Sequence, residues 1–138
     1  MTTLSARLMI PAIGALLLAL MLPAAGAAES KAGPKLAHIV FFTLKDRSPE
    51  SRAKFVASCH KYLTGHQGVS VFAVGTIADD VNEGAVSVRD FDVSLHAVFA
   101  SKEDEAVYLK HPRHLRFVEE NKANFEKVRV FDSYLNAP

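Results

Sequence analysis

The sequence SKEDEAVYLKHPRHLRFV, residues 101–118, predicts a helix that is interrupted once and then begins again. Ser101 followed three residues later by Asp104 is typical of a helix N-terminus. Because the residue before a proline is pushed out of the helical region, the first helix should end at His111. Pro112 suits the first position of a second helix. The apolar residues of this second helix should be Leu115, Phe117, Val118 and Phe125.

Three strands and one helix are expected before this segment, and one strand after it. The helix should begin at Ser48, which can cap it, with Pro49 in its first turn. Stretches rich in strand-forming residues cover 36–44, 69–77, 91–99 and 127–135. The order is β-α-β-β-α-β, with the second helix broken in two. This order predicts the α+β class and a ferredoxin-like fold, an antiparallel sheet with its helices on one face.

The predicted strands carry more apolar surface than helices on one face can cover. The first strand has Leu36, Val40, Phe42 and Leu44 on one face, and Ala37, Ile39 and Phe41 on the other. The second has Val69, Val71 and Ile77 against Phe72 and Val74, and the third has Phe91, Val93, Leu95, Ala97 and Phe99 on one face. A sheet with one wet face should alternate cleanly instead. We therefore expect a second copy of the chain to cover the free face, as a homodimer.

The N-terminal segment, residues 1–28, has the three parts of a secretory signal peptide. Arg7 gives a positive start, an apolar run follows, and small residues lead to a cleavage site after Ala27 or Ala28. The apolar run is shorter than the ~20 residues that a membrane-spanning helix needs. We expect an exported protein, periplasmic or secreted, without a stable membrane anchor after cleavage; an uncleaved anchor is the alternative.

The mature chain should be a short linker, residues 29–35, and one domain, residues 36–138. Of the 16 Lys and Arg residues one lies in the signal, so 15 remain against 15 Asp and Glu. Nucleic acid is therefore not expected as a partner, because binding phosphates needs a basic excess. The single cysteine, Cys59, cannot form an internal disulfide. It falls on the apolar face of the first predicted helix, where we expect a small core residue.

Four segments of the sequence are informative together: His38–Lys45, Phe91–Asp92, Tyr108–Phe117 and Val130–Asp132. With them the chain resembles the stress-responsive A/B barrel domain, over about residues 36–135. The His-Pro-x-His element is the most specific of them. The resemblance implies a dimeric α/β barrel. The family includes a plant polyketide cyclase that closes a ring by an intramolecular aldol condensation, and its motif implies catalytic roles for Tyr108 and His114, with His38 matching a histidine of the first strand.

The chemistry of these residues is compatible with a pocket. A histidine near a helix N-terminus, such as His114, is held neutral and can act as a base. A hydroxyl such as that of Tyr108 can donate a hydrogen bond to a developing enolate. The other residues expected at the pocket are His38, His111, Asp92, Asp132 and Phe117, the two aspartates as groups that could orient a histidine. For His111 the alternative is a structural cap at the break.

No cofactor or metal is expected from the sequence. His111 and His114 have the i, i+3 spacing of a ligand pair, but Pro112 breaks the helix between them. Three functions stay open. The first is an exported stress-response homodimer that binds a small apolar or aromatic ligand, the second a cofactor-free lyase or cyclase using His114 and Tyr108, and the third a structural or assembly protein with a filled pocket.

Overall fold

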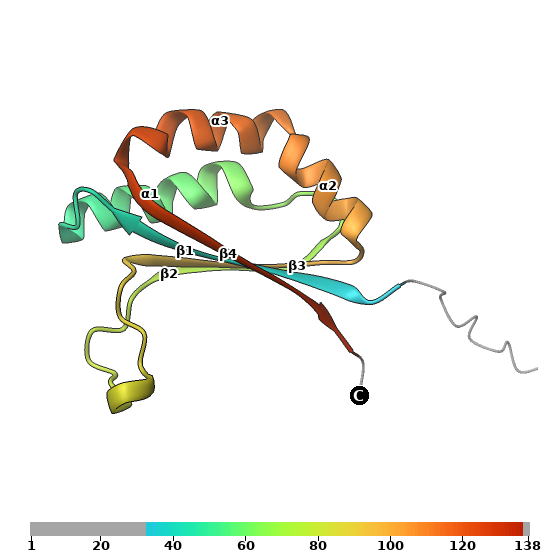
Figure 1. Cartoon of the computed structure of the whole chain (residues 1–138). Helices are drawn as coiled ribbons and strands as arrows, with labels where there is room; N and C mark the ends of the chain where they lie inside the picture. Colours follow the sequence, from blue (N-terminus) through green and yellow to red (C-terminus); the bar gives the residue numbers. More distant parts are fainter. Residues whose placement is uncertain (1–32, 137–138) are drawn as a thin grey trace, which may run out of the picture. The chain divides into compact units, whose positions relative to one another are not determined.

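The computed structural model describes residues 33–136, which contain four strands, three α-helices and two 3-10 turns (Figure 1). In chain order they are β1 Lys35–Leu44, α1 Pro49–Leu63, β2 Val69–Thr76, η1 Gly84–Val86, β3 Val93–Phe99, α2 Lys102–Lys110, α3 Pro112–Asn121, η2 Lys122–Asn124 and β4 Phe125–Leu135. The predicted signal peptide lies outside the described residues. No helix in 33–136 is both long and apolar enough to cross a bilayer.

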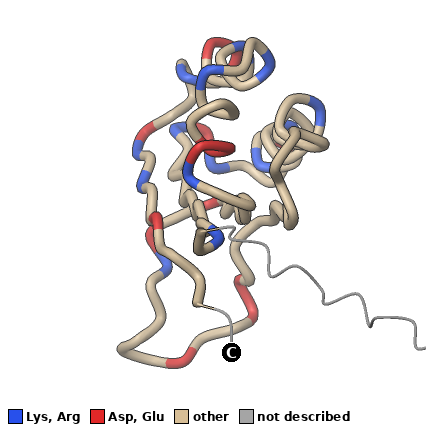
Figure 2. The backbone as a smooth tube through the Cα atoms, turned by 90° about the vertical axis from the view of Figure 1, so that its right-hand side faces the viewer, with Lys and Arg blue, Asp and Glu red and all other residues tan. Residues whose placement is uncertain are grey.

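The strands form one antiparallel sheet in the order β2-β3-β1-β4. The three helices lie on one face of this sheet, and the loop that contains η1 extends from the other face (Figure 1). In the turned view, acidic and basic residues are intermixed along the chain (Figure 2). The antiparallel sheet, with its helices on one face, confirms the ferredoxin-like α+β fold expected from the order of elements.

The helix boundaries follow local capping chemistry. The Ser48 hydroxyl accepts a hydrogen bond from the Ser51 amide, and the Ser101 hydroxyl accepts one from the Asp104 amide. His111 has extended backbone angles and separates α2 from α3, which begins at Pro112. The predicted break in the second helix is thus confirmed at the residues that predicted it.

Two aromatic residues were placed wrongly by periodicity. Phe125 does not belong to a helix: α3 ends at Asn121, and Phe125 is the first residue of β4, paired with Leu44. From there its ring packs 5.5 Å from that of Phe42. Phe91 precedes β3 and lies against Phe41, with ring centroids 4.8 Å apart, on the opposite face from Val93. For Phe125, strand pairing and core packing outweigh the local pattern, whereas Phe91 lies outside the strand ladder and outside the core.

The core lies between the sheet and the helices. Alternate residues of β1 and β3, and residues four apart on α1, fill it, including Leu44, Leu95, Phe99, Phe55 and Cys59. Cys59 is fully buried, and burial raises the pKa of its thiol to about 12. The prediction that this cysteine is a core residue is confirmed.

The other face of the sheet has no α-helix over it (Figure 1). Phe41 and Phe131 pack edge to face with centroids 5.7 Å apart, and Phe131 is 52% exposed. The prediction that Val69 and Val71 share one face of β2 is wrong, because the strand has a bulge between them. Val69 packs against the core, whereas Val71 is half exposed. A single chain therefore leaves this apolar face uncovered.

Candidate functional site

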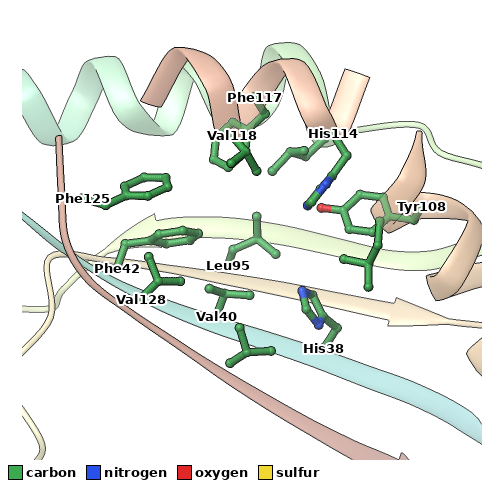
Figure 3. Close-up of a pocket in the computed structure, with 13 residues that line it drawn as sticks. His38, Val40, Phe42, Leu95, Tyr108, His114, Phe117, Val118, Phe125 and Val128 are labelled. Atoms are coloured by element: carbon green, nitrogen blue, oxygen red, sulfur yellow. The ribbon is translucent and has the colours of Figure 1, made fainter. Parts of the chain in front are cut away.

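A largely apolar cavity of about 350 Å³ lies on the helix side, between α2, α3 and the strands β1 and β4 (Figure 3). Its lining residues are His38, Val40, Phe42, Leu63, Leu95, Tyr108, Leu109, His114, Phe117, Val118, Phe125, Val128 and Val130. Three of them, His38, Tyr108 and His114, carry the polar groups. A mostly apolar cavity with a few polar groups is the usual form of a small-molecule site.

His114 reaches the cavity from the first turn of α3. The side chain of His111 caps this helix by accepting a hydrogen bond from the Arg113 amide at 3.1 Å, and His114 follows as the third helical residue. Burial lowers the pKa of His114, and the Leu109 carbonyl, which favours the protonated ring, does not offset this. Its Nδ1 atom is buried and has no hydrogen-bond partner within residues 33–136. The ring is therefore neutral near pH 7.

Tyr108 lies on α2 and is almost completely buried. Its hydroxyl points toward His114, and the two ring centroids are 4.7 Å apart (Figure 3). Burial raises the pKa of the phenol, which therefore keeps its proton. A protonated hydroxyl beside a neutral imidazole supplies one hydrogen-bond donor and one base at the same end of the cavity.

His38 enters the cavity from β1 and is held by a carboxylate on the neighbouring strand. His38 and Asp132 are directly paired in the β1–β4 ladder, so their side chains share a face. The His38 Nδ1 atom lies 2.8 Å from Asp132 Oδ1 and 3.2 Å from Glu105 Oε1. Asp132 does not line the cavity, but it contacts a residue that does. Sequence reasoning missed Glu105, although its i, i+3 spacing to Tyr108 places both on one face of α2.

Asp92 lies away from the cavity and contacts no histidine, contrary to the prediction that it belongs to the pocket. It is fully buried just before β3, where it accepts hydrogen bonds from the Leu44 amide at 2.9 Å and from the side chains of Arg47 and Arg52. Burial alone raises its pKa, but the Leu44 amide and the arginines outweigh that effect and lower it. Asp92 is thus the centre of a structural ion-pair cluster.

His111 does not line this cavity either. Its ring caps α3 and packs against the ring of His66, with centroids 4.6 Å apart. His66 was given no role from the sequence; it is buried, with Nε2 2.9 Å from the Tyr62 carbonyl oxygen. Phe117, by contrast, does line the cavity.

The fold and the cavity define the class of protein: a ferredoxin-like α+β domain with an apolar site under its broken second helix. The pattern of the Stress responsive A/B Barrel Domain family matches residues 36–135. The chain belongs to this family. A comparison with curated proteins found no match.

Solved structures share the fold. A family member from Mesorhizobium loti has 24% sequence identity and a TM-score of 0.62, over 76% of this chain and 100% of that one. A hydroxynitrile lyase from Passiflora edulis has 22% identity and a TM-score of 0.60, over 76% and 96%. A dimeric ferredoxin-like protein of unknown function from Thermobifida fusca has 15% identity and a TM-score of 0.62, over 75% and 92%.

Proposed function

We propose that the protein is an exported homodimer that binds a small apolar or aromatic ligand in the cavity between α3 and the sheet. The observation that carries this proposal is the cavity itself, about 350 Å³ in volume, with three polar groups in an otherwise apolar lining. Apolar walls favour a hydrophobic ligand body, while His38, Tyr108 and His114 can bind one polar substituent. A cavity of this size argues against the alternative of a structural protein whose pocket is filled by its own side chains.

The uncovered sheet face supports the homodimer. The rings of Phe41 and Phe131 contact each other on this face, opposite their neighbours Phe42 and Val130, and a second copy of the same face is the simplest apolar cover. The structural relative from Thermobifida fusca is described as dimeric. Export is proposed on the sequence of residues 1–28 alone, with its positive start, short apolar run and small-residue end.

The ligand is tested with a cavity-filling variant and a matched control. Val130 lines the cavity, whereas Val107 is exposed on α2 and lies outside that lining. We expect native mass spectrometry of the purified protein to detect a retained small molecule, and 1-naphthol to bind as a probe. Val130→Phe should abolish binding, because the larger ring occupies the space, and Val107→Phe should leave it unchanged. Equal binding by both variants contradicts the proposal.

A second candidate, a cofactor-free lyase or cyclase, is favoured by the pairing of His114 with Tyr108. The neutral His114 imidazole can take a proton from carbon next to a carbonyl, and the Tyr108 hydroxyl can donate a hydrogen bond to the oxygen of the resulting enolate. The enolate carbon would then attack a second carbonyl of the same molecule, and the resulting alkoxide would take the proton back from the His114 imidazolium. Loss of water from this product completes an aldol condensation. A relative of similar structure is a hydroxynitrile lyase. This candidate would be favoured if His114→Ala lost the enzymatic turnover of a substrate but still bound 1-naphthol.

A further inference from the structure

Three side chains from three different elements meet at one edge of the cavity. His38 comes from β1, Glu105 from α2 and Asp132 from β4. The His38 Nδ1 atom lies 3.2 Å from Glu105 Oε1 and 2.8 Å from Asp132 Oδ1, and one ligand atom from each residue lies within 4.8 Å of the others. These residues are distant in sequence, so only the tertiary fold brings them together.

The cluster is short of positive charge. Among the ion pairs and hydrogen bonds of residues 33–136, the carboxylates of Glu105 and Asp132 have no lysine or arginine partner; each contacts only His38. The Nδ1 atom of His38 carries at most one hydrogen, which one carboxylate at a time can accept fully. Glu105 is only 15% exposed, and burial together with the charge of Asp132 raises its pKa. Two acidic groups therefore compete for one donor in a poorly solvated place.

We propose that His38, Glu105 and Asp132 bind one divalent transition-metal ion, with Zn²⁺ as the first candidate. One imidazole nitrogen and two carboxylate oxygens form a mixed N/O donor set of the kind that zinc accepts, at about 2.0–2.2 Å per ligand. Around such an ion, neighbouring ligand atoms lie about 3–3.5 Å apart, close to the two separations that His38 makes. Mg²⁺ and Ca²⁺ prefer oxygen ligands alone and fit this set less well.

The position of the cluster suits an ion that binds from solvent. The Asp132 side chain is 48% exposed and gives the site access to water, while the His38 side chain is 8% exposed and lines the cavity. A metal on Nδ1 requires that this nitrogen carry no hydrogen, so in the bound state the ring hydrogen of His38 lies on the other nitrogen, Nε2. The ion would also fix the orientation of the His38 ring. The inference does not depend on an organic ligand in the cavity.

The test is calorimetric titration of the EDTA-treated protein with ZnCl₂. We expect one Zn²⁺ per chain. Glu105→Gln and Asp132→Asn keep side-chain shape but remove charge, and each should weaken binding by about tenfold or more, since changes even beyond the direct ligands cost about 10–100-fold. Glu103→Gln is the control, because Glu103 is exposed on the same helix and lies outside the cluster.

Folding is checked on the same samples by circular dichroism and thermal unfolding. Zn²⁺ should raise the melting temperature of the wild type and of Glu103→Gln, and should raise it less in Glu105→Gln, whatever the starting stability of that variant. In NMR spectra, Zn²⁺ should change the chemical shifts of the ring nitrogens of His38. The proposal is overturned if the wild type binds no Zn²⁺, or if Glu105→Gln and Asp132→Asn bind it as well as the wild type does.

Discussion

The ring of Tyr108 packs against the ring of His114 across the break between α2 and α3, with centroids 4.7 Å apart and planes at 59°. The break at Pro112 lets α3 start in a new direction, so residues from two helices border the same cavity. Placing His114 there means burying an imidazole, and burial lowers its pKa. The free energy of unfolding should therefore fall measurably in acid.

Acid should destabilise the protein through its buried histidines. The pKa values of His114 and His66 are both lowered, mainly by burial. The unfolded chain then binds more protons than the folded one below the ordinary histidine pKa of about 6.5. The free energy of unfolding should fall as the pH drops from about 6.5 toward the folded-state values. Glu105, whose pKa is raised, acts in the opposite sense at lower pH, since its carboxyl group stays protonated to a higher pH in the folded chain than in the unfolded chain.

The contribution of His114 is measured by urea unfolding of the wild type and of His114→Gln between about pH 7.5 and 5.5. The variant should lose less stability over this interval, because it has one imidazole fewer to protonate. His60→Gln, which removes an exposed ring from α1, is the control and should keep the wild-type dependence. Identical curves for all three proteins would contradict the expected role of burial.

The free sheet face should hold the proposed dimer together. Phe131→Glu places a charge beside Phe41 on this face, and we expect light scattering to report a monomer where the wild type is a dimer. Val107→Glu is the matched control: Val107 is even more exposed, but it lies on α2, on the helix side of the sheet. A dimer that survives Phe131→Glu and dissociates with Val107→Glu would place the interface on the helices instead.

Gly68 should resist substitution more strongly than Gly65. Both have positive φ angles, 80° and 68°, which cost any other residue about 1 kcal/mol or more. A methyl group on Gly68 would also collide with the side chain of Asp104, whereas Gly65 faces open space. Because Asp104 accepts a hydrogen bond from the Ser101 hydroxyl at the start of α2, the collision disturbs a helix cap. Gly68→Ala should therefore lower the free energy of unfolding by about 1–3 kcal/mol more than Gly65→Ala does in urea titrations.

The starts of the three α-helices could be predicted from the sequence, because capping residues and prolines determine them locally. Ser48, Ser101 and Pro112 each act on their own backbone neighbours, and the helices begin where these residues require. Phe125 was misplaced because its position depends on pairing with Leu44 and on packing against Phe42. Phe91 was misplaced because its ring packs against Phe41. No short window of sequence contains these contacts.

The candidate site was predicted only where the family motif or a helix start identifies a residue. His38, Tyr108 and His114 line one cavity, but the contact between His38 and Glu105 joins β1 to α2 and follows from no spacing in the sequence. Asp92 is the converse case. A carboxylate near a strand is compatible with orienting a histidine, and only the approach of Arg47 and Arg52 assigns it to a different cluster.

That arginine cluster gives a further prediction, because Asp92 is the only carboxylate of the described residues that is both fully buried and paired with two arginines. Asp92→Asn keeps the shape of the side chain but removes its charge from the Leu44 amide, Arg47 and Arg52. We expect it to lower the free energy of unfolding by about 2–4 kcal/mol. Asp79→Asn removes an exposed partner of Arg52, at 3.4 Å, and should cost less than about 1 kcal/mol.

The pH dependence separates a charge effect from a packing effect in Asp92→Asn. The lowered pKa of Asp92 means that its contribution is present above the ordinary aspartate value of about 3.8 and is lost as the pH falls through the folded-state value. The stability difference between the wild type and Asp92→Asn, measured by urea unfolding, should therefore be constant from neutral pH to about pH 4 and shrink below it. A difference that stays constant through the acid range would mean that Asp92 stabilises the fold by its shape and not by its charge.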